Sequence, residues 1–146
     1  MPRVEVIARG LLIEDGRILL CESLAGGYLY LPGGHVEFGE SAPAALRREL
    51  LEEAGLEVVA SDLALVSEAV FDAGARRHHE INLVFHVARR DRRHEVRSLE
   101  PAIAFRWVGL ADLAGLDVRP VGVRGWLAGR PGPGAAWLSE VGEPPP

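Results

Sequence analysis

The sequence of 146 residues contains no lysine, and all 16 of its basic residues are arginine. With 21 acidic residues the formal net charge is −5. A protein that coats nucleic acid needs a broad excess of positive charge, which this composition does not provide. A local cluster of arginines can still bind individual phosphate groups, because the guanidinium group pairs with two phosphate oxygens at once. The composition therefore counts against nucleic acid as a general partner.

Cysteine is also scarce, because the chain has only Cys21. One cysteine rules out an intrachain disulfide framework and fits a reducing compartment. The first residues, MPRVEVIARG, form no long apolar run, so the sequence predicts neither a secretory signal nor a membrane span. The 48% hydrophobic and 25% charged content is that of a soluble globular protein. We therefore expect a cytoplasmic enzyme or binding protein.

The length fits one domain, and no internal repeat is visible. We expect this domain to cover residues 1–130 and a proline- and glycine-rich, irregular tail to cover residues 131–146. Trp137 and Leu138 in the tail are expected to dock on the body or on a partner subunit. Apolar runs around the turn Asp15-Gly16 predict two strands within residues 4–23. Pro32-Gly33-Gly34 predicts a loop that interrupts an extended segment.

Further along the chain, the sequence predicts one long helix among strands, which indicates a mixed α/β fold. The helix covers residues 39–55, with Ser41 as its N-cap and Gly55 as its stop. Strands are predicted at residues 56–71 and 79–90, joined by a loop at residues 72–79. A strand at 103–110, a helical turn at 110–115 and a short helix at 119–129 follow. The arginine-rich segment 88–97 is interpreted as a solvated hairpin tip rather than a route for RNA.

Three carboxylates crowd the C-terminal part of the long helix, at Glu49, Glu52 and Glu53. Exposed like charges at this spacing repel by roughly 0.2–0.5 kcal/mol per pair. The helix dipole also favours cations, not anions, at this end. Mg²⁺ prefers carboxylate, phosphate and water oxygens, so a bound cation would turn the repulsion into attraction. The triplet alone is equally compatible with a solvated acidic surface.

The neighbouring residues favour the metal site. Gly33-Gly34 leaves backbone carbonyls unobstructed just ahead of the helix. Arg48 adjoins Glu49 and is placed to hold it by charge-assisted hydrogen bonds. Glu40 precedes the helix cap and is a candidate for the same cluster.

The stretch GHVEFGESAPAALRRELLEEAGL, residues 34–56, resembles the Nudix box. That pattern is Gly, five residues, Glu, seven residues, and then Arg-Glu-U-x-Glu-Glu-x-Gly-U, where U is a bulky aliphatic residue. The preceding YLPGG also resembles the family's usual lead-in. All nine fixed positions are filled at the right spacing, by Gly34, Glu40, Arg48, Glu49, Leu50, Glu52, Glu53, Gly55 and Leu56.

The resemblance implies an α/β/α sandwich in which a mixed sheet carries the box as a loop-helix-loop. It also implies hydrolysis of a nucleoside diphosphate linked to another group X, giving a nucleoside monophosphate and phosphorylated X. Glu49, Glu52 and Glu53 would then bind Mg²⁺ or Mn²⁺ with help from the Gly33 carbonyl. Arg48 would orient Glu49. Glu40 would be a secondary ligand of the metal or of its water.

The resemblance leaves the general base open, because family members take it from the box or from a later loop. Glu52 and Glu53 are the candidates within the box, and we favour a box residue. Glu100 is the best candidate outside it, because it lies just before the strand at 103–110. Glu80 and Glu95 are weaker candidates, and a surface position explains Glu80 about as well.

Two groups of residues are candidates for the substrate pocket. Tyr28 and Tyr30 alternate along an extended run, so their side chains share one face and are candidates to stack on a base. Arg76, Arg77 and His79 lie on a loop expected to overhang the box helix, where they would contact phosphate or ribose. Ordinary packing for the tyrosines, and solvent exposure for the loop, are the alternatives.

The sequence as a whole predicts a Nudix pyrophosphohydrolase that uses Mg²⁺ or Mn²⁺. A nucleotide sugar, a nucleoside triphosphate (oxidised ones included) and a dinucleoside polyphosphate remain open as substrates. An RNA 5′-end pyrophosphohydrolase, a nucleotide sensor without turnover and an isoprenoid diphosphate isomerase are the alternatives. The isomerase would need a reactive cysteine, whereas Cys21 is expected to be a buried small residue. The family resemblance also predicts a homodimer.

Overall fold

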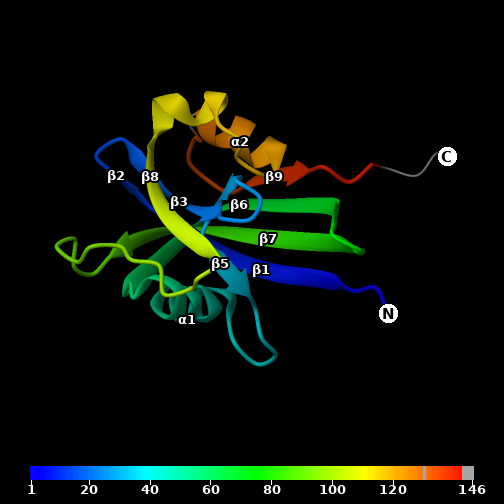
Figure 1. Cartoon of the computed structure of the whole chain (residues 1–146), viewed down its shortest axis with the longest axis horizontal. Coiled ribbons are helices and arrows are strands. Elements are labelled where there is room, and N and C mark those ends of the chain that lie inside the picture. Colours follow the sequence, from blue (N-terminus) through cyan, green and yellow to red (C-terminus); the bar gives the residue numbers. More distant parts are fainter. Residues whose placement is uncertain (130, 143–146) are drawn as a thin grey trace.

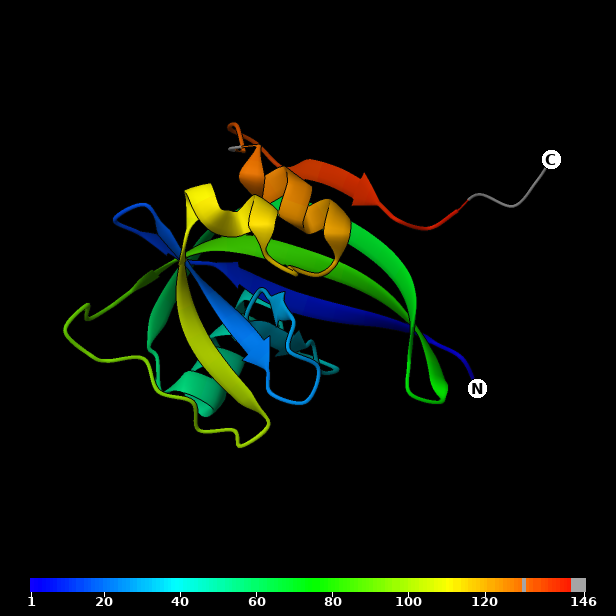
Figure 2. The ribbon, with the colours of Figure 1, turned by 45° about the horizontal axis from the view of Figure 1, so that its top comes forward.

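The computed structural model describes residues 1–129 and 131–142 of the chain. Two β-sheets form the centre of the molecule, and one helix covers them on each side (Figure 1). Turning the molecule shows the short C-terminal helix and the last strand together on one side, with the longer helix on the other (Figure 2). The α/β/α sandwich with a mixed sheet is therefore confirmed.

The larger sheet has five strands in the order β5-β1-β7-β6-β9. Strands β6 (Val58–Ala73) and β7 (Arg76–Arg89) form a long antiparallel hairpin. Strand β1 (Val4–Leu11) runs parallel to β7 and antiparallel to the short β5 (Gly33–His35). Strand β9 (Ala136–Ser139) pairs in parallel with β6 and forms the other edge. This mixture of parallel and antiparallel pairs brings the segment before the box helix next to β1.

The smaller sheet is antiparallel and centres on β3 (Arg17–Ser23). Its other strands are β2 (Ile13–Glu14), β4 (Leu29–Tyr30) and β8 (Ile103–Gly109), each of which pairs with β3. The turn from β2 to β3 has positive φ angles at Asp15 and Gly16, 51° and 73°. Aspartate and glycine tolerate this conformation, so the hairpin predicted from the Asp-Gly pair is confirmed.

Helix α1 (Ala42–Ala54) and helix α2 (Val121–Ala128) cover opposite sides of the sheets, and a 3₁₀ turn, η1 (Leu110–Gly115), follows β8. The strands contribute side chains to both sides of the sheets, because successive side chains alternate between faces. On β3, Ile18 and Leu20 belong to the hydrophobic cluster under α2, whereas Leu19 belongs to the cluster under α1. One set of strands therefore holds both helices in fixed positions.

Four expectations about local structure were wrong. Residues 76–79 belong to β7, so the hairpin turns at Gly74-Ala75 and has no long loop. Gly33-Gly34 lies in strand β5 rather than in a loop. The tail contains strand β9, because its apolar residues Ala136 and Leu138 pack against the core. The arginine-rich segment after β7 connects the two sheets and is not a hairpin tip.

No helix among the described residues is long and apolar enough to span a membrane. Residue 130 and residues 143–146, which fall in the domain's last position and in the expected tail, lie outside the described part of the chain.

Candidate active site

Helix α1 starts and ends where its sequence predicts. The Ser41 hydroxyl accepts a hydrogen bond from the Ala44 amide at 3.2 Å, which satisfies one free N–H of the first turn. Gly55 ends the helix with φ = 63°, a left-handed conformation that glycine adopts without steric cost. Leu46 and Leu50 are buried against the sheets. The three glutamates of the box stand off this apolar stripe on the last two turns of a rigid, well-capped helix.

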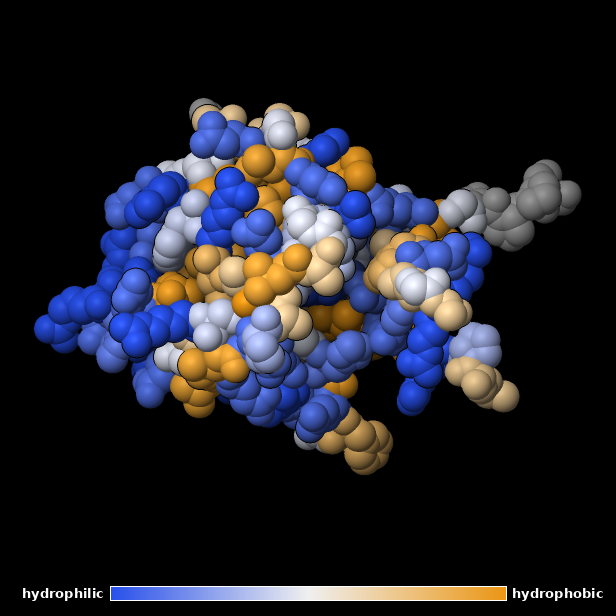
Figure 3. Space-filling view, in the orientation of Figure 1, coloured by the Kyte–Doolittle hydropathy of each residue, from blue (hydrophilic) through white to orange (hydrophobic). Residues whose placement is uncertain are grey.

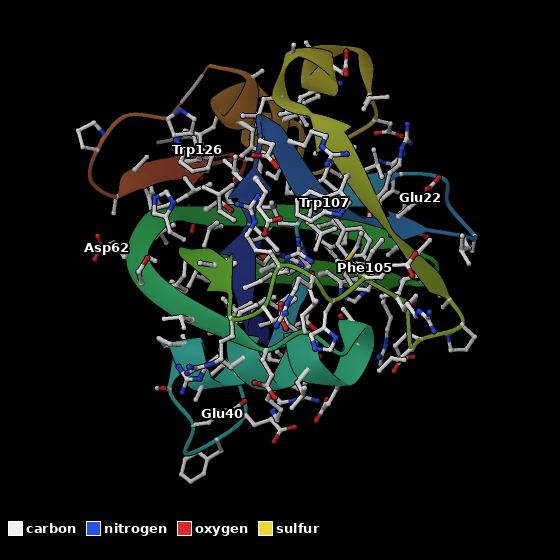
Figure 4. All side chains as sticks on the ribbon, turned by 90° about the vertical axis from the view of Figure 1, so that its left-hand side faces the viewer. Glu22, Glu40, Asp62, Phe105, Trp107 and Trp126 are labelled. Atoms are coloured by element: carbon white, nitrogen blue, oxygen red, sulfur yellow. The ribbon has the colours of Figure 1, made fainter. Side chains whose placement is uncertain are left out.

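Arg48 is at the centre of a hydrogen-bond network that joins helix α1 to the segment before it. Its guanidinium group donates to Glu40 at 2.7 and 3.2 Å and to Glu49 at 2.9 Å. It also donates to Glu52 at 3.3 Å and to the His35 carbonyl oxygen at 3.2 Å. These bonds connect the box helix, the loop before it and strand β5. Figure 4 shows Glu40 near the N-terminal end of the helix, away from Phe105 and Trp107 on β8.

Glu53 is the carboxyl group of this cluster whose pKa is raised. Burial, the neighbouring Glu49 charge and a hydrogen bond to Glu49 raise the pKa of Glu53 to about 7, with a smaller contribution from Glu100. Arg9 acts in the opposite direction but does not cancel these effects. Ionising both carboxylates in this position is energetically unfavourable without a nearby cation. Arg48 pairs with Glu49, and Arg9 offsets only part of the effects on Glu53.

Gly33 and Gly34, at the start of the box, allow the backbone to come close to Glu49 and to β1. A Cβ atom at Gly33, where φ is 152°, would overlap the backbone carbonyl oxygen of Ala8. A Cβ atom at Gly34 would overlap the carboxylate of Glu49. Strand β5 thus lies directly against the glutamate that Arg48 holds.

Within residues 1–129 and 131–142, no three His, Cys, Asp or Glu side chains already surround one point as metal ligands would. Glu52 explains this, because its side chain is 57% exposed and turned toward Arg48, whereas the Glu49 side chain is 17% exposed. The donor set nevertheless fits a hard divalent cation. It offers Glu53, whose pKa is raised, the neighbouring carboxylate of Glu49 and a third carboxylate, Glu52.

The candidate bases outside the box lie in different surroundings. The loop that carries Glu100 is tied to the end of the box helix, because the Leu99 amide donates to the Glu53 carbonyl oxygen at 2.7 Å. Glu100 acts on the pKa of Glu53 and so belongs to the site's electrostatics. Glu80 instead pairs with Arg9 at 3.6 Å, and Glu95 is exposed beside Arg97.

Tyr28 and Tyr30 share one face, as their spacing predicts, with ring centroids 5.9 Å apart. The Arg119 guanidinium group stacks on the Tyr28 ring at 4.4 Å and is held by Asp117 at 3.0 and 3.1 Å. Tyr30 is half-buried, and burial raises the pKa of its phenol. One face of Tyr28 is therefore already covered, which leaves less of its ring for a base.

Arg76, Arg77 and His79 do not overhang the box helix. Arg76 and Arg77 are exposed next to the hairpin turn, which extends beyond the body of the molecule on the side of the N-terminus (Figure 1). His79 pairs in the sheet with Val4 and Val70. The structure does not bring these three residues together with the acidic cluster.

Comparison with known proteins agrees with this geometry. The model of the NUDIX domain matches residues 1–126. A putative 8-oxo-dGTP diphosphatase 2 of Mycobacterium tuberculosis is 35% identical over 133 residues, which is 85% of this chain and 86% of that protein. The chain belongs to the Nudix family.

Solved Nudix structures have the same fold. The MutT protein of Methanosarcina mazei is 25% identical with a TM-score of 0.70, covering 86% of this chain and 91% of that one. The MutT Nudix hydrolase of Burkholderia pseudomallei is 27% identical with a TM-score of 0.56, covering 74% and 84%. The protein is thus a Nudix pyrophosphohydrolase that acts on nucleotide derivatives.

Sequence reasoning missed three polar residues on the neighbouring strands β1, β6 and β7, namely Arg9, Ser67 and Asn82. Arg9 donates to Asn82 Oδ1 at 2.6 Å and to the Leu31 carbonyl oxygen at 2.9 Å. Ser67 and Asn82 are the buried polar side chains of the described core. A signal was present, because each of the three interrupts an apolar strand. A single polar residue in a strand does not, however, indicate which partners it meets.

Proposed function

We propose that the protein uses a divalent metal to hydrolyse the pyrophosphate bond of a nucleoside diphosphate linked to a group X. The products are a nucleoside monophosphate and phosphorylated X. The carboxyl pair Glu49–Glu53 carries this proposal, because it is partly buried and like-charged, and the pKa of Glu53 is raised as a result. A purely structural helix face would gain nothing from that arrangement.

The residues present fit Mg²⁺ or Mn²⁺. Glu49, Glu52 and Glu53 would hold the metal, with the Gly33 carbonyl and Glu40 as further oxygen donors. When bound, such an ion neutralises the diphosphate and lowers the pKa of its bound water. Arg48 keeps Glu49 and Glu40 in fixed orientations through the bonds at 2.7–3.2 Å.

Glu53 is our candidate for the general base, in agreement with the preference for a box residue. A group with a pKa near the working pH combines a large deprotonated fraction with enough basicity to accept a proton. The pKa of about 7 meets this condition. Glu100 then supports the base through its charge, and Glu52 remains the alternative within the box.

Among the open substrates we favour nucleoside triphosphates, oxidised ones included. The support is the name of the M. tuberculosis relative, an 8-oxo-dGTP diphosphatase. Nucleotide sugars and dinucleoside polyphosphates remain the competing substrates. Cys21 argues against an isoprenoid isomerase. It is fully buried, and burial raises the pKa of its thiol to about 12, so the thiol is not reactive.

A cytoplasmic location and a homodimer complete the proposal. The single buried cysteine is compatible with a reducing compartment. The dimer rests on the family resemblance, and light scattering of the purified protein tests it.

The decisive experiment is product release from a nucleotide panel with Mg²⁺ or Mn²⁺. The panel includes ADP-ribose, sugar nucleotides, dinucleoside polyphosphates and common and oxidised triphosphates. We expect one class to be cleaved fastest and Glu53→Gln to lower kcat by about a thousandfold, since it removes a base and a metal ligand. Equal turnover by wild type, Glu52→Gln and Glu53→Gln would overturn the site assignment. Glu57→Gln, an exposed glutamate just after the box, is the matched control.

A further inference from the structure

The larger sheet extends beyond helix α1. In Figure 1 and Figure 2, α1 lies at one end of strands β1, β6 and β7, and the opposite ends of these strands continue past it toward the N-terminus and the β6–β7 turn. The residues that β1 and β7 contribute to the cluster under α1 are Ala8, Phe85 and Val87. Side chains on the same side of the sheet but nearer the β6–β7 turn are therefore not covered by this helix.

The register of the strands shows which side chains share this uncovered side. From Ala8 under α1, the pairing runs to Leu83 on β7, Val66 on β6 and Trp137 on β9. Paired residues, and alternate residues along one strand, point to the same side of a sheet. This side therefore carries a patch, here called the outer face, whose apolar members are Val4, Val6, Ile81, Leu83, Val66 and Trp137.

The outer face is exposed although it is apolar. Trp137 is 59% exposed, Val4 51% and Val6 40%, and the other three apolar members are partly exposed. None of the six belongs to either hydrophobic cluster of the described residues. A sheet with one side in solvent normally carries polar residues on that side. The outer face departs from this pattern and therefore needs a cover.

The opposite side of the same strands is polar. It carries Arg9 on β1 with Glu80 and Asn82 on β7, and Arg9 binds both of them and the Leu31 carbonyl oxygen. In Figure 3 the surface is hollowed right of centre, where Figure 1 places β1 and β7 at depth, and hydrophilic residues (blue) lie below the hollow and to its right. The strands thus turn these polar residues toward the rest of the molecule and apolar residues outward, the reverse of what solvation alone would favour.

The size of the outer face fits a contact with another protein chain. The face spans strands β1, β7, β6 and β9. With strands about 4.8 Å apart and three rows of side chains about 6.7 Å apart, it covers roughly 400 Å². Apolar patches of this size on a monomer often mark interaction sites, and a stable contact takes about 800 Å² from each partner. Phe38 can extend the face, because it is fully exposed on a loop that is tied to β1 by the hydrogen bond from the Val36 amide to the Val6 carbonyl oxygen at 2.9 Å.

The charges of the outer face favour a second copy of this chain as the partner. Glu68 pairs with Ile81, and His79 pairs with Val70 in the next row, so one carboxylate and one imidazole lie near the centre of the face. In a twofold contact residue i meets residue j twice, so Glu68 of each copy can accept a hydrogen bond from His79 of the other. The face carries no arginine, whereas a membrane surface or a nucleic acid would need basic residues.

We propose that the outer face is the contact between two copies of this chain, which pack sheet against sheet with Trp137 as the main anchor. Exposed aromatic residues commonly supply most of the binding energy of such contacts. The inference rests on the homodimer of the proposed function and adds the surface through which it forms. It does not depend on hydrolysis, because the box carboxylates lie on α1 and not on this face.

The test measures the dimer dissociation constant by sedimentation velocity over a range of protein concentrations. Val6→Glu brings two charges into the contact and should raise this Kd about a hundredfold. Trp137→Ala should raise it at least tenfold, without adding a charge. Val59→Glu is the matched control, because Val59 is a strand valine of similar exposure, 46%. Its neighbour Val58 packs under α1, so Val59 points to the other side of the sheet and its Kd should equal that of the wild type.

Nucleotide hydrolysis by the same samples separates this inference from the proposed reaction. A dimer that Val6→Glu and Trp137→Ala weaken and Val59→Glu does not would support the inference even if no nucleotide were cleaved. A wild type that stays monomeric at every concentration would overturn it while hydrolysis could still be observed. A dimer whose Kd neither Val6→Glu nor Trp137→Ala changes would also overturn it, because its contact would lie elsewhere on the surface.

Discussion

At the scale of single residues, Arg48 does what a lysine cannot do. Its planar group donates to three carboxylates and to one backbone carbonyl at the same time. A lysine ammonium is a compact charge that cannot span these acceptors in fixed directions. The complete absence of lysine from the chain makes arginine the residue that performs every such task.

The first prediction concerns this network. Arg48→Lys keeps the charge but loses the planar fork, so Glu49 and Glu40 lose their fixed orientation. We expect the Mg²⁺ concentration for half-maximal activity to rise about 10–100-fold, as for other groups that orient metal ligands. Magnesium titrations of the initial rate measure this. Arg47→Lys, at the exposed neighbouring position, is the control. An unchanged magnesium requirement in Arg48→Lys would contradict the role.

The second prediction uses the raised pKa of Glu53. A carboxyl group with a pKa of about 7 in the folded protein and an ordinary value when unfolded stabilises the fold while protonated. This contribution is complete below the unfolded pKa near 4.5 and is lost as the pH rises through 7. In metal-free buffer, the Tm of the wild type should therefore fall below that of Glu53→Gln between pH 5 and pH 8.

Magnesium should reverse this effect, because a cation between the carboxylates removes their repulsion. Added Mg²⁺ at pH 8 should raise the Tm of the wild type more than that of Glu53→Gln. Scanning calorimetry over this pH range makes both comparisons. A difference in Tm that stays constant with pH would show that Glu53 ionises normally.

At the scale of elements, the two adjacent glycines of strand β5 have different neighbours. A side chain at Gly33 meets backbone, which cannot move away, whereas one at Gly34 meets the end of a flexible glutamate. The same substitution should therefore damage the fold at one position and the chemistry at the next.

The third prediction follows from this contrast. Gly34→Ala should displace the Glu49 carboxylate, lowering kcat at least tenfold while Tm changes little. Gly33→Ala should destabilise the protein by about 1–3 kcal/mol, because the β1–β5 pairing must open. Thermal unfolding of the two variants measures the effect on stability, and initial rates measure the effect on kcat. Equal effects of the two alanines on both quantities would contradict it.

Elements with strong local signals could be predicted from the sequence. Helix α1 has a cap, an apolar stripe and a stop residue, and the hairpin β2–β3 has its Asp-Gly turn. The box spacing also predicted that Glu49, Glu52 and Glu53 lie on this helix. Strand β9 could not be predicted, because its four residues lie among prolines and glycines and become a strand only by pairing with β6. The neighbours of Arg9 and Ser67 could not be predicted, because they come from four separated strands.

At the scale of the whole molecule, strand β9 connects the end of the described chain to the larger sheet and to helix α2. It pairs with β6, and the Glu140 side chain accepts a hydrogen bond from the Gly122 amide in the first turn of α2 at 2.5 Å. Leu138 packs on the cluster under α2, while Trp137 is 59% exposed. The tail expected to be irregular thus stabilises the short helix.

The fourth prediction compares these neighbours. Leu138→Ala should lower the free energy of unfolding by about 1–2 kcal/mol, since a partly buried leucine loses its packing. Trp137→Ala should change it by less than about 0.5 kcal/mol if the chain is monomeric. Chemical denaturation measures both. A large effect of Trp137→Ala, together with a change in mass by light scattering, would instead place Trp137 at the predicted dimer contact.

The alternation of strand side chains between two hydrophobic clusters has a consequence for how such an enzyme can diverge. The carboxylates of the box stand on helix α1 over one cluster, and helix α2 packs over the other. The strands of the two sheets lie between these helices. Substitutions under α2 can therefore accumulate while the box carboxylates on α1 keep their positions.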